Sequence, residues 1–231
     1  MSNDLNIPED FSFQLQKRKK GKTTSLEEEE RKLLLEFTEL EAKYKDGLWE
    51  LAWMYSTSGQ PVKALAYIQK LLNITDDSDN NKVQCCLSMG QLMEQMHDFE
   101  NAVIFYSQAF TLKTTNSDAW YLIHNNTGYC LNQLGKHKEA KKYCQAAIEI
   151  NSARHNAHKN LGIAYTGLGD NQAAVESFIR ATRANASDPR ALGHLEKLIS
   201  QHPELLIQMP DLLLELEKCR KAVNTIKKMT S

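Results

Sequence analysis

Residues 161–174 read LGIAYTGLGDNQAA, and residues 127–140 read TGYCLNQLGKHKEA. The same pattern occurs earlier in the chain, as LAWMYSTSGQPVKA at 51–64 and as MGQLMEQMHDFENA at 89–102. Every copy has glycine or alanine in second place, a large apolar or aromatic residue in fifth place and alanine in fourteenth place, and three copies have glycine in ninth place. Such repetition predicts a stack of similar units whose function lies in a shared surface rather than in a catalytic pocket.

The small residues of this pattern have a physical explanation. Two antiparallel helices approach closely only where their side chains are small, so we expect Gly128 and Gly162 in a first helix to face Ala140 and Ala174 in a second. The glycine in ninth place ends the first helix, where a left-handed backbone would strain a residue that has a Cβ atom. One such pair cannot bury its apolar face alone, so neighbouring pairs must stack.

The spacing identifies the unit. The second-place residues lie at positions 52, 90, 128 and 162, which are 38, 38 and 34 residues apart. With the alanines that follow, this pattern resembles the tetratricopeptide repeat, a helix-turn-helix unit of about 34 residues. Two excesses of four residues fall around 76–82 and 114–120, and they predict either longer loops or an extra helical turn.

The resemblance implies an all-α fold, a right-handed α-α superhelix, over residues 45–188. The four helix pairs would occupy 45–78, 83–116, 121–154 and 155–188. One departure from the family pattern is that His124 and His158 stand in the first helices where a large apolar residue is usual.

The two ends of the chain differ from the repeats. Residues 1–24 predict a flexible polar tail, whose basic run Lys17–Lys22 is either a solvated segment or a nuclear-import or phosphate-binding signal. A capping box at Ser25 and an apolar stripe predict an N-terminal capping helix at 25–44. Residues 189–231 predict C-terminal capping helices, with Asp188 as the N-cap of the first. Alternatively, the last helix docks onto a second copy or a partner.

Composition argues against several classes of protein. The 231 residues are 42% hydrophobic and 25% charged with a net charge of −1, which argues against a general nucleic-acid binder. No apolar run is long enough to cross a membrane, and Met1–Asp10 does not resemble a secretory signal. The five scattered cysteines favour reduced thiols. We therefore expect a cytoplasmic protein, with a nuclear location left open by the basic run.

The sequence shows no catalytic motif. It has no glycine-rich phosphate loop after a strand, no nucleophile motif and no metal-ligand spacing, so we predict a non-enzymatic protein without a cofactor. His155 and His158, with His124 in the preceding repeat, come nearest to a metal site. No carboxylate or cysteine lies at a matching spacing, and we predict no metal site.

In the implied superhelix, the first helices line a concave groove that is rich in amides and hydroxyls. The candidate partner contacts in this groove are Trp49, Trp53, Gln91, Asn125, Asn126, Tyr129, Lys159 and Asn160. Asn126 and Asn160 occupy equivalent sites and resemble the asparagine ladder with which some members of the family hold an extended peptide by its backbone. Alternatively, they are ordinary exposed polar residues. Trp49 and Trp53 are either an aromatic anchor for a partner or are covered by the helix at Leu33–Leu40.

One binding mode of the family can be tested on the sequence. Members that bind the acidic tails of heat-shock chaperones hold the terminal carboxylate with two lysines, two asparagines and an arginine. The matching positions here are Leu87, Gln91, Asn126, Asn156 and Asn160. Only Asn126 fits the clamp, and its cations are missing, so we predict no chaperone-tail binding of that type.

The sequence therefore favours an adaptor that binds an extended peptide or a helix of a partner protein in its concave groove. The alternative is a self-assembling scaffold that uses its convex face and terminal helices. A third reading, nucleic-acid binding through Lys17–Lys22, would require strongly salt-dependent association.

Overall fold

The computed structural model describes residue 28 and residues 41–75, 79–112 and 116–230. Within these ranges the secondary structure is helical, without a strand. The predicted tail at 1–24, with its basic run, and most of the predicted capping helix at 25–44 lie outside the described residues. The helix at Leu33–Leu40 that was expected to cover the tryptophans lies outside them too.

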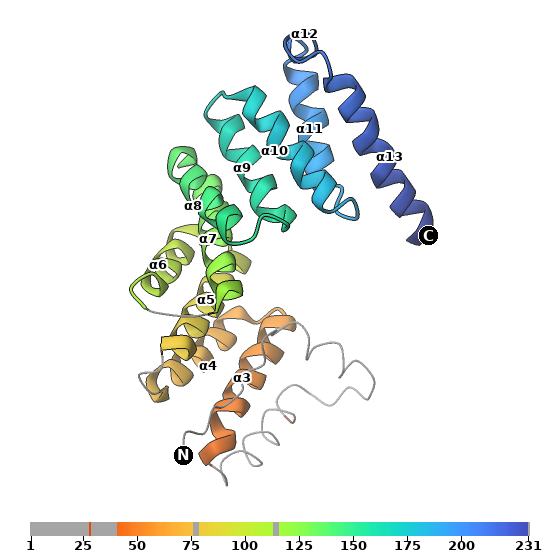
Figure 1. The fold of residues 1–231 in the computed structure, drawn as a ribbon. Helices are drawn as coiled ribbons and strands as arrows, with labels where there is room; N and C mark the ends of the chain where they lie inside the picture. Colours follow the sequence, from red (N-terminus) through yellow and green to blue (C-terminus); the bar gives the residue numbers. More distant parts are fainter. Residues whose placement is uncertain (1–27, 29–40, 76–78, 113–115, 231) are drawn as a thin grey trace.

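Pairs of antiparallel helices follow one another along the chain (Figure 1). The first four pairs are α3 (Glu41–Thr57) with α4 (Pro61–Ile74), α5 (Asp79–Gln95) with α6 (Phe99–Ala109), α7 (Ser117–Gln133) with α8 (His137–Ile150), and α9 (His155–Gly167) with α10 (Asn171–Ala184). They are followed by α11 (Arg190–Gln201), the short α12 (Leu205–Gln208) and α13 (Leu212–Thr230).

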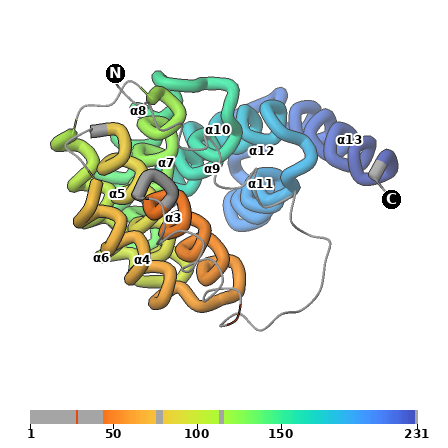
Figure 2. The backbone as a smooth tube through the Cα atoms, turned by 90° about the horizontal axis from the view of Figure 1, so that it is seen from below, coloured from red at the N-terminus to blue at the C-terminus, as the bar shows by residue number. Residues whose placement is uncertain are grey.

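The pairs stack in order, so that each packs on the next, and α3 and α13 lie at opposite ends of the described chain (Figures 1 and 2). First helices also pack on first helices, α5 against α7 and α7 against α9. The predicted all-α superhelix of four helix pairs is therefore the observed fold.

The extra residues between repeats lengthen the first helices. Both α5 and α7 have 17 residues, whereas α9 has 13. Because α5 begins at Asp79 and α7 at Ser117, the additional turn stands at the start of each first helix. Likewise α3 begins at Glu41 and runs through the expected boundary between residues 44 and 45, where no glycine or proline interrupts it.

The second-place glycines are sites of close helix contact, as predicted, but their nearest neighbours differ from those expected. A Cβ atom at Gly128 would lie 2.6 Å from Sγ of Cys144, and one at Gly162 would lie 2.5 Å from the ring of Phe178. The nearest neighbour is thus the residue four positions after the repeat alanine. The repeat alanine is among the nearest neighbours only at Gly128, where the carbonyl oxygen of Ala140 would lie 3.3 Å from the added Cβ atom.

The ninth-place glycines end the first helices in the left-handed conformation, as predicted. The φ angles of Gly59, Gly135 and Gly169 are 76°, 71° and 77°. His97 stands at this place in the second copy and takes the same conformation, with φ of 59°. A residue with a Cβ atom is strained in this region.

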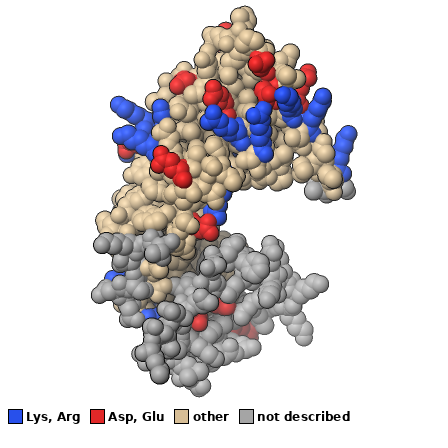
Figure 3. All heavy atoms as spheres, in the orientation of Figure 1, with Lys and Arg blue, Asp and Glu red and all other residues tan. Residues whose placement is uncertain are grey.

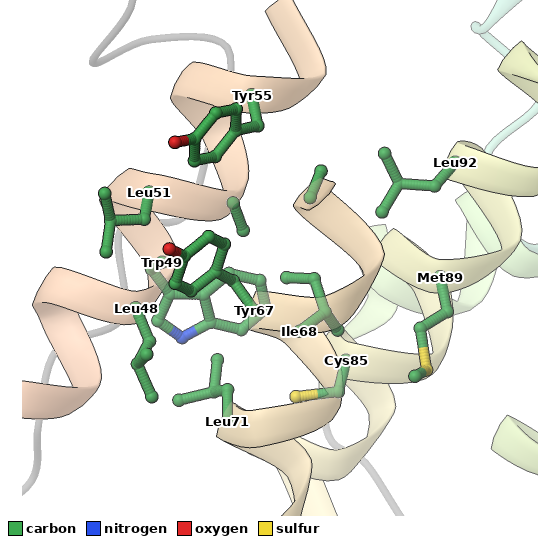
Figure 4. Packing of buried hydrophobic residues seen from close by; sticks show 12 residues of the cluster. Leu48, Trp49, Leu51, Tyr55, Tyr67, Ile68, Leu71, Cys85, Met89 and Leu92 are labelled. Carbon is green, nitrogen blue, oxygen red and sulfur yellow. The ribbon is translucent and has the colours of Figure 1, made fainter. Parts of the chain in front are cut away.

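A hydrophobic core runs between successive helix pairs, and Figure 4 shows its first part. There, Trp49 of α3 belongs to one buried cluster with Tyr67, Ile68 and Leu71 of α4 and Met89 of α5. Further along the chain, His124 lies among aromatic rings, with centroid distances of 4.8 Å to Phe110 and 5.9 Å to Tyr143. This aromatic packing explains how a histidine replaces the usual apolar residue.

The C-terminal helices close the stack on α10. Leu195 and Leu198 of α11 and Leu212 and Leu216 of α13 are buried in one cluster with Phe178 of α10. The N-cap of α11 is Pro189 and not Asp188 as predicted, because the helix begins one residue later, at Arg190. The Asp188 carboxylate still accepts a 3.1 Å hydrogen bond from the backbone N–H of Arg190. The short helix α12 was not predicted. In the part of the chain that the structure describes, no helix has the length and apolar character of a membrane span.

Candidate functional site

A cleft of about 400 Å³ opens across the first helices of three successive pairs, and we call it the first-helix cleft. Its lining residues come from α3, α5 and α7, with Ile68 from α4. They are Ala52, Ser56, Ile68, Ser88, Gln91, Leu92, Glu94, Gln95 and Tyr129. Two of the predicted contact residues, Gln91 and Tyr129, are therefore brought together in one cleft.

Tyr129 and the pair Ser56–Gln95 shape the walls of the cleft. The ring of Tyr129 packs edge-to-face on Phe99, with centroids 5.9 Å apart and an interplanar angle of 86°. The Gln95 amide donates to Oγ of Ser56 at 3.1 Å and so joins α5 to α3. These contacts hold the side chains of three lining residues in place.

Glu94 places a carboxylate in this cleft. Its Oε1 accepts a 2.6 Å hydrogen bond from the Tyr106 hydroxyl and a 3.6 Å hydrogen bond from the Cys130 thiol. Burial raises the pKa of Glu94 to about 7, against the opposing effect of these two hydrogen bonds. Glutamate stands here at a position where the other repeats have the neutral residues Ser56, Asn132 and Thr166. The register of the repeats predicts that Glu94 faces the groove, although Glu94 is not among the eight candidate contacts.

Ser88 of α5 also lines the cleft. It is only 5% exposed, and among the described residues its Oγ has no hydrogen-bond partner. Buried hydroxyls usually have a partner, so this Oγ retains unused hydrogen-bonding capacity.

The asparagines of the third and fourth repeats join the repeats to each other. Asn160 is 3% exposed, and its Nδ2 donates to Oδ1 of Asn125 at 3.1 Å. Asn132 in turn donates to the backbone carbonyl of Asn160 at 2.8 Å. Asn125 is buried as well. Both side chains are buried and their amide N–H groups donate within the protein, although Oδ1 of Asn160 has no partner among the described residues. Because of this burial between α7 and α9, the ladder interpretation has to be revised for Asn125 and Asn160.

Asn126 differs from its equivalent Asn160. It is partly buried, accepts a 2.9 Å hydrogen bond from Asn125 and donates a longer one of 3.4 Å to the Tyr106 hydroxyl. One chain of hydrogen bonds therefore runs from Asn160 in the fourth repeat through Asn125, Asn126 and Tyr106 to Glu94 in the second. This network sets the carboxylate in a fixed place.

Comparison with known proteins agrees with this architecture. Family models described as tetratricopeptide repeat match residues 121–154 and 157–190. Tetratricopeptide repeat protein 7B of Homo sapiens is 28% identical over 138 residues, which are 60% of this chain and 15% of that protein. The third and fourth helix pairs are therefore tetratricopeptide repeats. It spans less than a sixth of the length of this curated relative.

Solved structures of similar shape show the same fold. MamA from Desulfovibrio magneticus RS-1 superposes with a TM-score of 0.61 at 17% identity, over 78% of this chain and 96% of that one. BtubC from P. vanneervenii gives a TM-score of 0.63 at 18% identity, over 90% of this chain and 92% of that one. Tetratricopeptide repeats are in general interaction modules rather than enzymes, and their stacked pairs offer extended concave surfaces to other proteins.

The remaining predicted contact residues are mostly buried. Trp49 is 8% exposed, and the second helix of its own pair covers it. Trp53 is partly buried, and among the described residues its Nε1 has no partner. Lys159 is buried beside Asn156, and burial lowers its pKa, an effect that the nearby Arg190 increases. The lining of the first-helix cleft does not include these three residues.

The chaperone-clamp positions are also unlike a clamp. Leu87 and Asn160 are buried, and Asn156 accepts from Lys159 at 3.5 Å. The absence of this binding mode stays a prediction. In the described ranges, no group of three or more histidine, cysteine or acidic side chains is placed to hold a metal ion. His155 instead contacts Asp188 at 3.0 Å, and His158 contacts the carbonyl of Ser152 at 2.9 Å.

Charge lies mainly away from the cleft. On the face drawn in Figure 3, lysine and arginine side chains gather over the C-terminal helices, interspersed with acidic ones. Their sequences account for this, since α13 alone contains Lys218, Arg220, Lys221, Lys227 and Lys228. The first-helix cleft is lined by neutral residues apart from Glu94.

Proposed function

We propose that this protein is an adaptor that binds an extended segment of a partner protein in the first-helix cleft. The observation that carries the proposal is the cleft itself, which crosses three successive first helices and is lined by hydroxyl, amide and aromatic side chains. Such groups hold a peptide by its backbone and by a few side chains, and a preformed cleft limits the entropy lost on binding.

A selection from a library of short displayed peptides tests this proposal. Selected peptides are expected to lose at least about tenfold in affinity when Tyr129→Ala and Gln91→Ala are combined, because these side chains line the cleft. The matched control combines Gln108→Ala on α6 with Gln145→Ala on α8, two exposed amides on second helices. The proposal fails if binding survives the cleft substitutions or is lost equally in the control.

Tyr129 and Gln91 are better probes of the cleft than the predicted contacts Asn126 and Asn160. Replacing Asn126 and Asn160 by alanine would remove a buried contact between repeats, so a loss of binding in that variant would not separate a groove contact from a weakened fold. Tyr129 and Gln91 are only partly buried, and they avoid this difficulty. Circular dichroism of each variant verifies that the helices remain.

The second candidate function, a self-assembling scaffold, is favoured by apolar side chains at the C-terminal end. Ile207 is 84% exposed, Leu213 56% and Leu214 52%. Sedimentation at increasing concentration tests it, with Ile207→Ser and Leu213→Ser as variants. The scaffold function predicts an oligomer that dissociates when these side chains are replaced, whereas the adaptor function does not require an oligomer. Deleting residues 205–231 is a poorer test, because it removes the buried Leu205, Leu212 and Leu216.

A cytoplasmic location belongs to the same proposal. All five cysteines are free and buried, which suits a reducing compartment. Fluorescence microscopy of the tagged chain tests the location, and a signal confined to the nucleus or to a secretory compartment would contradict it.

A further inference from the structure

Glu94 brings the only formal charge to the lining of the first-helix cleft, among the residues that the structure describes. The groups that surround it are a phenol from α6, a thiol and an aromatic ring from α7, and hydroxyl and amide side chains from α3 and α5. None of these groups is a cation. A partner that enters the cleft therefore meets an isolated negative charge.

The hydrogen bonds of this carboxylate leave one oxygen available. Tyr106 and Cys130 both donate to Oε1, and no described residue donates to Oε2. These neutral donors orient the carboxylate without neutralising it. A carboxylate that is partly withdrawn from water gains most from an opposite charge, because its desolvation is otherwise uncompensated.

Two further features of the cleft suit a cationic head group. The buried Oγ of Ser88 is without a partner in the described chain and can accept a hydrogen bond from an N–H donor. The ring of Tyr129 lines the same cleft, and an aromatic face attracts a cation. The volume of about 400 Å³ lies within the range of about 300–1,000 Å³ that is usual for ligand sites.

We propose that the first-helix cleft binds a lysine or arginine side chain of the partner segment, with its cationic head against Oε2 of Glu94. This inference rests on the proposed adaptor function and adds the chemistry of the partner to it. An acidic side chain would meet a like charge here, and an apolar one would leave Oε2 of the carboxylate and the Ser88 hydroxyl without a donor.

The test is a peptide-library selection on the full chain, run in parallel on the wild type, Glu94→Gln and Glu100→Gln. Glu100→Gln is the matched control, because it removes the same charge at an exposed position on α6. The wild type and the control are expected to enrich lysine or arginine at one peptide position. Glu94→Gln is expected to lose that enrichment and still to select peptides through the rest of the cleft.

A second measurement does not depend on how the variant folds. A selected peptide is resynthesised with glutamine in place of its enriched lysine or arginine, and its affinity for the wild type is expected to fall at least about tenfold. Its affinity for Glu94→Gln should change little. Glutamine at position 94 still accepts from the Tyr106 hydroxyl, so the variant is expected to keep its helices.

The pH dependence gives an independent readout. Binding of the basic peptide should strengthen from about pH 6 to about pH 8, since Glu94 has to be ionised to attract the cation. The titratable groups that face Glu94 are Tyr106, Cys130 and Tyr129, and burial raises the pKa of each, so they stay neutral over this range. The peptide that carries glutamine should show no such dependence.

The failure of this inference is distinct from the failure of the proposed function. Peptides that depend on Tyr129 but carry no enriched basic position would overturn the inference and leave the adaptor standing. Enrichment that persists in Glu94→Gln would overturn it as well. If no selected peptide depends on Tyr129 and Gln91, the adaptor proposal falls, and the basic-residue site falls with it.

Discussion

The Tyr106 hydroxyl on α6 donates a 2.6 Å hydrogen bond to Oε1 of Glu94 on α5. The bond fixes the carboxylate, yet burial outweighs it and raises the pKa of Glu94 to about 7. In the unfolded chain a glutamate titrates near about 4.3. The folded protein therefore binds the Glu94 proton more tightly than the unfolded chain does. This tighter binding stabilises the folded state fully below about pH 4, and the stabilisation is lost as the pH rises through about 7.

We predict from this that Glu94→Gln stabilises the protein at alkaline pH. At about pH 8 the variant should exceed the wild type in free energy of unfolding by up to about 3 kcal/mol, the equivalent of the pKa shift. Near about pH 3 the difference should almost vanish, because Glu94 is then protonated in both the folded and the unfolded state. Urea denaturation of both proteins at several pH values measures this difference in the free energy of unfolding. A pH-independent difference, or the same trend in Glu100→Gln, would contradict the assignment.

The repeat frame could be predicted from the sequence because it depends on local sterics. Gly135 and Gly169 mark helix ends by the backbone conformation that glycine allows, and Gly128 and Gly162 mark close contacts by the absence of a Cβ atom. These properties belong to single residues. They are visible in a sequence without knowledge of the neighbours.

The candidate contacts were harder to predict because burial depends on the neighbouring repeat. Asn126 and Asn160 share one place in the frame, but Asn160 donates into Asn125 of the preceding repeat, and Asn126 finds the Tyr106 hydroxyl instead. Trp49 is covered by the second helix of its own pair, which helical spacing alone does not show. Similarly, Glu94 stands out in the cleft because the groups around it are neutral, and these neighbours come from other helices.

Asn160→Ala is predicted to weaken the contact between the third and fourth repeats. The substitution removes the hydrogen bonds from Asn160 to Asn125 and leaves the buried Oδ1 of Asn125 without a donor. We expect a loss of roughly 1–3 kcal/mol in the free energy of unfolding. Asn156→Ala, one turn earlier on α9, should cost less than about 0.5 kcal/mol. Equal losses in both variants would show that the buried network contributes little.

Gly128→Ala is predicted to destabilise the third repeat by overpacking. The new Cβ atom would lie 2.6 Å from Sγ of Cys144, and backbone atoms 3.3 Å away limit the room to move. A cost of about 1–3 kcal/mol is expected. Adding Cys144→Ala removes the clashing sulfur, so the double variant should be more stable than the sum of the single losses predicts. Simple additivity in chemical denaturation would contradict this steric explanation.

The left-handed turn at His97 gives the last prediction. His97 has φ of 59° where the other repeats have glycine, and a residue with a Cβ atom is strained there by about 1 kcal/mol. His97→Gly should therefore raise the melting temperature. The substitution also removes the ring contact with Phe99, which reduces the gain, so the expected net increase is about 2 °C. Gly135→Ala is the reverse control. No atom lies within 4 Å of the Cβ position there, so its expected loss of about 1 kcal/mol is purely conformational. A lower melting temperature for His97→Gly would mean that the contact between His97 and Phe99 outweighs the backbone strain.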